Sequence, residues 1–275
     1  MKKHSLILGA LTAGILISIA GCKSKETSMP QDEVIKDSIK ASSFDNLNLI
    51  ITQIPAPSQI SKELSKEGVP VNASILNSPD KASSYSGTSQ QAVNMGIYGA
   101  DMGYLASYNQ MQQATSYMVQ VAKLAGALGI TSAYDQKLMD QFKTAVNNKD
   151  SIDIVIQTAF DRAQKELYSS KRAATSTLIF AGGWIEGLYI ATSIVKDEKS
   201  DKNAALYTKI WQHVYAFSYL QKALTDFQSN PDCATMLKTL QPLFTAASQL
   251  NDGGFALKDV QNLKATITDI RSKLI

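Results

Sequence analysis

The chain has 275 residues, of which 44% are hydrophobic and 19% are charged. This length and composition allow one large domain or two modest domains with a substantial core. The formal net charge is only +3, and no basic run is longer than two residues, as in Lys171-Arg172. The sequence therefore lacks the clustered positive charge of nucleic-acid-binding proteins, and we expect no nucleic-acid partner.

The first 22 residues have the pattern of a processing signal. Lys2-Lys3 precedes an uncharged apolar run over residues 6–19, and Ala20-Gly21-Cys22 follows. The pattern resembles a bacterial lipoprotein signal, which implies that residues 1–21 are removed and that Cys22 becomes a lipidated N-terminus. The alternatives are a transmembrane helix and an ordinary secretory signal. The run is shorter than the roughly 20 residues that a membrane span needs, and small residues mark a cleavage site.

A lipidated Cys22 predicts a protein that is anchored to a membrane and does not span it. Lys23 follows the cysteine, as in outer-membrane lipoproteins of Gram-negative bacteria, although the sequence leaves the leaflet open. Residues 23–33 are polar and without periodicity, so we expect a flexible tether at residues 22–33. We expect residues 34–275 to form a single α-helical domain. Cys233 then has no disulfide partner, and we expect it to pack as a small apolar residue near a helix start.

The remaining sequence predicts an all-α fold, a bundle of about eight mostly antiparallel helices joined by short connections. No segment shows sustained strand alternation. Gly68 and Gly129 are helix terminators, and Asn230-Pro231 is an N-cap followed by proline at the first helical position. Caps, breakers and apolar spacing predict helices at residues 59–67, 88–128, 132–146, 151–168, 171–196, 203–228, 231–250 and 257–274. We expect the helix over 88–128 to be broken or bent around its glycines.

Two of these helices contain several glycines, each of which costs roughly 1 kcal/mol inside a helix relative to alanine. In the first helix the small residues lie on one side, and they are Ala92, Gly96, Gly99, Gly103 and Ser107. The second helix holds Gly182, Gly183 and Gly187. Such strips let another backbone approach closely, and we expect these two helices to pack near each other.

Each glycine-bearing helix also carries one acid close to tyrosine. Asp101 has Tyr98 and Tyr104 three residues away on either side, and Glu186 has Tyr189 three residues later. Asp101, Tyr104, Glu186 and Tyr189 therefore form the candidate ligand site or core polar site. In the functional interpretation the acids line a cavity and bind a cation or a polar ligand. In the structural interpretation, which we favour, tyrosine hydroxyls or a neighbouring helix terminus donate hydrogen bonds to them.

The apolar run from Ala173 to Val195 contains Glu186 as its single charge. A transmembrane span is one interpretation of this run. An acid in the middle of a membrane helix costs roughly 2.5–3.5 kcal/mol, and a lipid anchor makes a span redundant. We therefore expect a buried core helix.

Three segments resemble stretches in an uncharacterised family of exported Bacteroidetes-type helical proteins. They are residues 54–57 (IPAP), 98–104 (YGADMGY) and 181–189 (AGGWIEGLY). The resemblance covers about residues 50–195 and implies a Gram-negative envelope setting. It implies no catalytic residue, because no activity is established for that family.

Common catalytic motifs are missing from the sequence. His213 is the single histidine after the signal segment, and it shares a helix side with Ile210 and Phe217. This position indicates a half-buried structural histidine. A zinc site with several His or Cys ligands is excluded by count, and no P-loop, dinucleotide fingerprint or EF-hand loop is present. We expect no cofactor, no metal and no catalytic residue of these classes.

Two Asp-Ser-Ile triplets occur at residues 37–39 and 150–152. They resemble a short O-glycosylation motif of exported Bacteroidetes proteins, which would place a glycan on Ser38 or Ser151. The alternative at Asp150-Ser151 is an ordinary helix N-cap. The sequence leaves both open.

The leading functional hypothesis is a lipid-anchored, non-enzymatic protein of the outer membrane or cell envelope that binds a small ligand or a protein partner. It rests on the anchor pattern and on a large bundle without recognisable catalytic machinery. One alternative is a hydrolase or cation-dependent enzyme that uses Asp101 and Glu186. Another is a purely structural envelope component.

Overall fold

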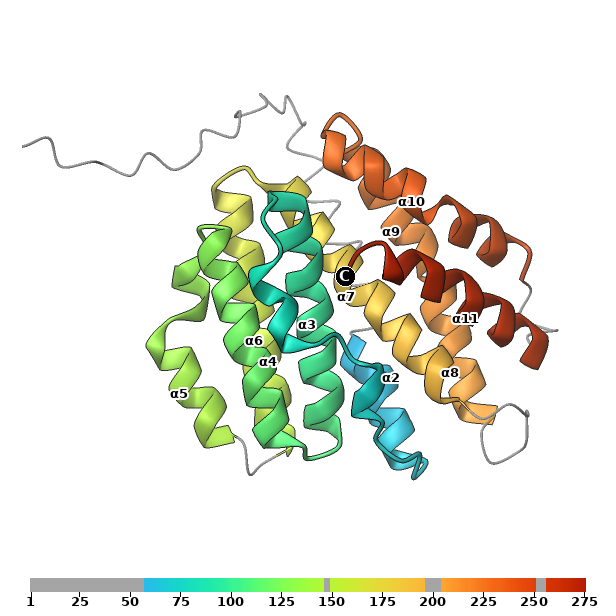
Figure 1. The fold of residues 1–275 in the computed structure, drawn as a ribbon, viewed down its shortest axis with the longest axis horizontal. Helices are drawn as coiled ribbons and strands as arrows, with labels where there is room; N and C mark the ends of the chain where they lie inside the picture. Colours follow the sequence, from blue (N-terminus) through green and yellow to red (C-terminus); the bar gives the residue numbers. More distant parts are fainter. Residues whose placement is uncertain (1–56, 146–148, 196–203, 251–255) are drawn as a thin grey trace, which may run out of the picture. The chain divides into compact units, whose positions relative to one another are not determined.

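The computed structural model describes residues 57–145, 149–195, 204–250 and 256–275. All regular structure in these residues is helical, which confirms the all-α class (Figure 1). The described residues hold ten α-helices and three short 3-10 helices, where about eight helices were expected. The α-helices are α2 (Pro57–Lys66), α3 (Thr88–Ser107), α4 (Met111–Ala127), α5 (Gln136–Ala145), α6 (Lys149–Ser169), α7 (Ala173–Ile194), α8 (Ala204–Tyr215), α9 (Phe217–Asp226), α10 (Pro231–Ser248) and α11 (Leu257–Ser272).

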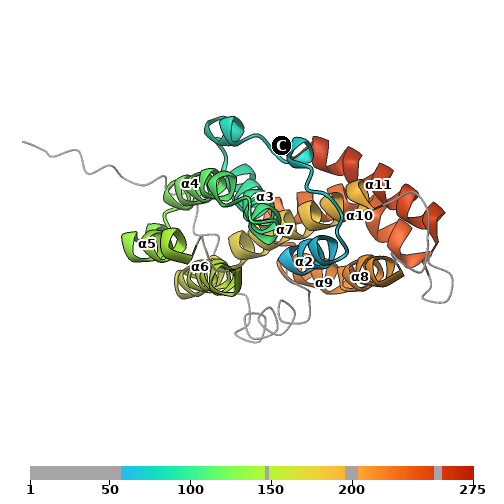
Figure 2. The same ribbon diagram turned by 90° about the horizontal axis from the view of Figure 1, so that it is seen from below.

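Helices α3 and α7 form the centre of the bundle (Figures 1 and 2). Helix α3 also contacts α4 and α6, and α2 packs against both α3 and α7. Helix α7 contacts α11 and α10, while α5 packs on α6 at the periphery. Almost every side chain of α3 and α7 is buried as a result. A helix that is apolar on all sides is the expected element at such a position.

The two central helices touch backbone to backbone. A Cβ added at Gly96 of α3 would lie 1.9 Å from the Ile179 carbonyl oxygen, and one added at Gly182 of α7 would lie 1.9 Å from the Val93 carbonyl oxygen. The expectation that the glycine-bearing helices pack together is confirmed. Gly99 of α3 makes room for a different helix, α6, because a Cβ at this position would lie 2.4 Å from the Phe160 ring.

The helix expected over residues 88–128 is two helices. Helix α3 ends at Ser107, and Asn109 adopts a left-handed conformation with φ of 57°. The Gln110 amide then donates to the Leu105 carbonyl oxygen at 2.9 Å, which closes the turn before α4. Asparagine tolerates this conformation better than most residues. A break or bend was expected at the glycines of this segment, but Gly96, Gly99 and Gly103 lie within α3 and the break occurs at Asn109.

Two other predicted boundaries differ from the structure. The segment expected to be a helix from Ser132 begins as a 3-10 helix over Thr131–Tyr134, and α5 follows with the Asp135 carboxylate accepting from the Leu138 amide at 2.8 Å. The helix expected over 203–228 divides at Ala216 into α8 and α9, where no glycine or proline marks the break.

Several expected helix ends are confirmed. Asn230 caps α10 by accepting from the amides of Asp232 at 2.9 Å and Cys233 at 3.2 Å, with Pro231 at the first helical position. Gly68 and Gly129 follow α2 and α4 with φ of 68° and 67°. Only a left-handed residue makes these turns, which is why glycine stands at both positions.

Within the described part of the chain, α7 is long and apolar enough to cross a membrane by length and composition. However, 78% of its most apolar stretch is buried inside the protein. Burial against α3, α2 and α11 accounts for that hydrophobicity. This arrangement agrees with the expectation of a core helix.

Candidate functional site

Asp101 of α3 and Glu186 of α7 lie together in the core, and both side chains are 0% exposed. Arg271 of α11 reaches them from the C-terminal helix. Its Nε lies 2.5 Å from Oε2 of Glu186, and its Nη2 lies 2.7 Å from Oε1. This is a bidentate guanidinium–carboxylate pair, the most directional kind of ion pair. We refer to Asp101, Glu186 and Arg271 as the buried triad.

The segment between α2 and α3 closes the triad from another side. Nη2 of Arg271 also donates to the Ile75 carbonyl oxygen at 3.2 Å, and the Asn77 amide donates to Oδ2 of Asp101 at 3.2 Å. These bonds join the central helices, the C-terminal helix and this connecting segment at one point. The triad therefore links parts of the chain that are far apart in sequence.

The end of α11 is held at a second point. The Asn94 side chain donates from Nδ2 to the Leu274 carbonyl oxygen at 2.8 Å, and its Oδ1 accepts from the Asn77 side chain at 3.3 Å. Asn94 is 0% exposed. Through these two hydrogen bonds, Asn94 of α3 holds the residues that follow α11 and the 72–78 segment against α3.

The tyrosines near the acids have roles other than those expected. The Tyr98 hydroxyl donates to the Ser78 carbonyl oxygen, and the Tyr104 hydroxyl accepts from the Asn72 amide, both at 2.8 Å. These two side chains hold the connecting segment in place, and the donor to Asp101 is the Asn77 amide. The Tyr189 ring lies 4.1 Å from the Arg271 guanidinium carbon and forms a cation–π contact.

Arg271 was missed by the sequence analysis, although the sequence contains a signal for it. It lies four residues after Ile267 and next to Ile270, so it falls on the apolar side of α11. Both of these isoleucines are buried. A basic residue on the buried face of a helix requires an acidic partner, and Glu186 is such a partner.

The triad holds two acids and one base, and this imbalance perturbs their protonation. Burial and then the charge and hydrogen bond of Glu186 raise the pKa of Asp101 well above its ordinary value, against the opposing effects of Arg271 and the Asn77 amide. Burial lowers the pKa of Arg271, but Glu186 and Asp101 outweigh it and raise the pKa. A protonated Asp101, an ionised Glu186 and a charged Arg271 give a neutral cluster.

His213 is part of the core, and it is more deeply buried than expected. Its side chain is 0% exposed, its ring stacks on Trp184 with 4.7 Å between centroids, and its Nε2–H donates to the Trp184 carbonyl oxygen at 3.1 Å. Burial lowers its pKa to about 4, against the opposing effect of that carbonyl. A neutral, stacked and enclosed imidazole supports the structural interpretation of this residue.

Cys233 also occupies the expected kind of position. It is buried near the start of α10, and its thiol donates to the Ala174 carbonyl oxygen at 3.8 Å. Cys22 lies outside the described residues. Among the described residues, no group of three or more His, Cys, Asp or Glu side chains is placed to hold a metal ion.

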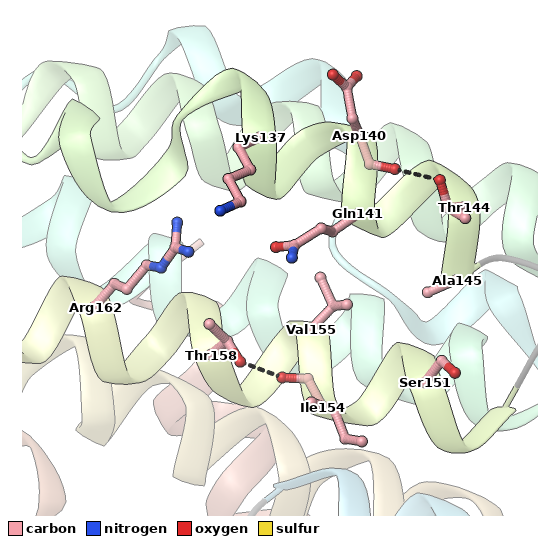
Figure 3. Close-up of a pocket in the computed structure, with 10 residues that line it drawn as sticks. All are labelled: Lys137, Asp140, Gln141, Thr144, Ala145, Ser151, Ile154, Val155, Thr158 and Arg162. Atoms are coloured by element: carbon pink, nitrogen blue, oxygen red, sulfur yellow. Dashed lines mark hydrogen bonds between the residues drawn. The ribbon is translucent and has the colours of Figure 1, made fainter.

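An open groove of about 920 Å³ lies between α5 and α6 (Figure 3). At one end the cationic groups of Lys137 and Arg162 point into the groove, while Val155 and Ala145 line the part farther along (Figure 3). The remaining residues that line it are Asp140, Gln141, Thr144, Ser151, Ile154 and Thr158. The groove depends on how α5 lies on α6, so the local sequence pattern does not predict it.

The charges at the groove have a net positive balance. The Asp140 carboxylate points away from the groove (Figure 3), accepts from the Gln136 side chain at 2.8 Å and lies 3.7 Å from Nζ of Lys143. Arg162 pairs with Asp135 at 3.2 Å. The guanidinium has further N–H groups to offer, so the cationic end of the groove can accept an anion.

Ser151 of the second Asp-Ser-Ile triplet lies in the first turn of α6 and lines the same groove. The first triplet, with Ser38, lies outside the described residues. Modification of either serine stays a prediction.

Neither protein-family models, nor curated proteins, nor solved structures give a match to this chain.

Proposed function

We propose that this protein is a lipid-anchored, non-enzymatic component of the bacterial cell envelope whose helical domain binds a small anionic ligand. The anchor rests on the sequence pattern that ends at Cys22. An intact-mass measurement on the chain from its native host tests the anchor, because lipidation adds the mass of the acyl groups. The same measurement would detect a glycan on Ser151 by its own added mass.

The environment of Glu186 is the observation that favours binding over catalysis. Both of its carboxylate oxygens accept from Arg271, and the side chain is fully enclosed. A catalytic carboxylate must come within hydrogen-bond reach of a substrate, and a cation ligand must offer free oxygen atoms. The buried triad therefore supports a structural tie in the core better than it supports the hydrolase or cation-dependent alternative.

The groove between α5 and α6 is the better candidate for a ligand. Its volume of about 920 Å³ falls within the range of roughly 300–1,000 Å³ typical of small-molecule sites. Lys137 and Arg162 supply positive charge at one end, and Val155 offers apolar surface beyond them. This combination suits a carboxylate or phosphate ester that also carries an apolar group.

Thermal unfolding in the presence of organic carboxylates, phosphate esters and divalent cations tests this function. A ligand at 100 times its dissociation constant adds roughly 2.7 kcal/mol to the free energy of unfolding. We expect an anionic compound to raise the melting temperature of the wild type and of Asp101→Asn alike. Thr158→Trp, which fills the groove, should remove the shift.

Thr208→Trp is the matched control. Thr158 and Thr208 are both helical threonines whose hydroxyl donates to the carbonyl four residues earlier. Thr158 is partly buried and lines the groove, whereas Thr208 is exposed on α8. A ligand whose shift is lost in Asp101→Asn and kept in Thr158→Trp would contradict the proposal and favour the acids as the site. A purely structural envelope component predicts no shift with any compound.

A further inference from the structure

Asp101 has one oxygen without a donor. Its Oδ2 accepts from the Asn77 amide, but its Oδ1 is fully buried and has no hydrogen-bond partner in the described part of the chain. A buried acceptor without a donor is costly, at about 1–3 kcal/mol. The orphaned oxygen therefore requires an explanation.

The neighbour that can satisfy this oxygen is Glu186. The Glu186 carboxylate lies in the same enclosed cluster, and its charge acts on Asp101. Two carboxyl groups share a hydrogen bond only when one of them carries a proton. Both oxygens of Glu186 accept hydrogen bonds from Arg271, so the guanidinium already balances the charge of this carboxylate. The added proton therefore belongs on Asp101.

The other groups that face Asp101 keep a constant charge near neutral pH. Tyr98 from α3 and Tyr117 from α4 both face it. Burial is the main cause that raises the pKa of each of these phenols, so both stay neutral. Arg271 from α11 stays positive, and the 72–78 segment contributes the uncharged Asn77 amide. Asp101 is therefore the member of this cluster whose charge can change.

Helix α11 and the 72–78 segment cover Asp101. Helix α11 packs on α7 and α10, and the Arg271 side chain is 8% exposed, so the triad lies just beneath this helix. Arg271 of α11 and the Leu274 carbonyl just past its end attach this part of the chain to the central helices and the 72–78 segment. Displacement of α11 is therefore a short route by which water can reach Asp101.

We infer that Asp101 is a proton-binding site that couples pH to the docking of the C-terminal helix α11. With the proton bound, the triad is neutral and α11 is seated. Without the proton, the enclosed cluster carries one uncompensated negative charge. An open state that lets water solvate this charge is then favoured.

The direction of the pH effect follows from linkage. The pKa of Asp101 is higher in the closed state than when the side chain is exposed, so the closed state binds more protons above the ordinary value of 3.8. The stability that the proton contributes is complete below that value and is lost as the pH rises through the raised pKa. In this window the opening equilibrium increases roughly tenfold for each pH unit.

Hydrogen exchange of the full chain in detergent, followed by mass spectrometry from about pH 5 to about pH 8, tests the inference. After correction for intrinsic exchange, we expect protection of the α11 amides to fall by up to roughly tenfold per pH unit. Asp101→Asn keeps a neutral side chain, so its α11 protection should not fall as the pH rises. Glu186→Gln leaves one acid and one base, and it should also remove the slope.

Infrared spectroscopy gives an independent measurement of the same proton. The wild type should show the C=O stretch of a protonated carboxylic acid at neutral pH. Asp101→Asn should lose this band, and Asp140→Asn, which alters an exposed acid on α5, should keep it. Wild-type α11 protection without a pH slope, or a band that persists in Asp101→Asn, would overturn the inference.

Discussion

Among single residues, Arg271 is the one that makes the burial of Glu186 possible. A carboxylate that is fully enclosed among apolar helices carries a desolvation cost of several kcal/mol. The Arg271 guanidinium is buried as well. It binds the Glu186 carboxylate, donates to the Ile75 carbonyl oxygen and lies against the Tyr189 ring. Such pairs contribute less net stability than their short distances suggest, but removing one partner is severe because the other charge is left buried and alone.

Arg271→Leu should therefore lower the free energy of unfolding by about 3–5 kcal/mol. The double variant Arg271→Leu/Glu186→Leu should recover most of this loss, because no unpaired acid remains. Arg162→Leu is the surface control, since its pair with Asp135 is partly exposed and such pairs contribute about 0–1 kcal/mol. Denaturant unfolding measures all three, and equal losses for Arg271→Leu and Arg162→Leu would refute the role of the triad.

Among the helices, the crossing of α3 and α7 decides where the acids meet. Gly96 and Gly182 let each helix touch the backbone of the other. This close approach brings Asp101 and Glu186 into one cluster. The glycines are unfavourable for each helix alone, and the packing of the pair compensates for that cost.

Gly182→Ala should destabilise the fold, because its Cβ would lie 1.9 Å from the Val93 carbonyl oxygen and the central helices would have to separate. Overpacking of this kind costs typically about 1–3 kcal/mol, and occasionally more. Gly126→Ala on α4 is the matched control, because its Cβ would lie 3.6 Å from a Thr131 methyl group, at an ordinary contact distance. There the better helix propensity of alanine should raise stability by up to about 1 kcal/mol. A loss for Gly126→Ala as large as that for Gly182→Ala would contradict the crossing as the cause.

For the whole molecule, the buried groups Asp101 and His213 make stability depend on pH in opposite directions. Burial raises the pKa of Asp101 and lowers that of His213 to about 4. Unfolding returns both groups to ordinary values. Between its ordinary and its folded-state pKa, Asp101 holds a proton in the folded state that it loses in the unfolded state. His213 does the opposite, because it gains a proton on unfolding between about pH 4 and about pH 6.5.

Between about pH 4 and about pH 6.5 the two contributions should oppose each other in the wild type. In Asp101→Asn the histidine acts alone, so stability should fall as the pH drops from about 6.5 to about 4, by about 3 kcal/mol over the window. In His213→Phe, which preserves a ring against Trp184, stability should instead fall as the pH rises. Denaturant unfolding across this range measures both slopes, and slopes of the same sign in the two variants would disprove the assignment.

Local spacing by itself determined the helical class, the caps at Asn230-Pro231 and the glycine terminators, because helix formation depends on neighbours three and four residues apart. It also singled out Asp101 and Glu186 as unusual in apolar helices, and the glycine strips predicted that their helices meet. Only the tertiary structure decided that Arg271, 85 residues beyond Glu186, is their partner, and that the tyrosines bond the connecting segment. It also decided the groove between α5 and α6. A buried charge can be compensated from any part of the chain, and a groove exists only between packed elements, so neither is encoded in local periodicity.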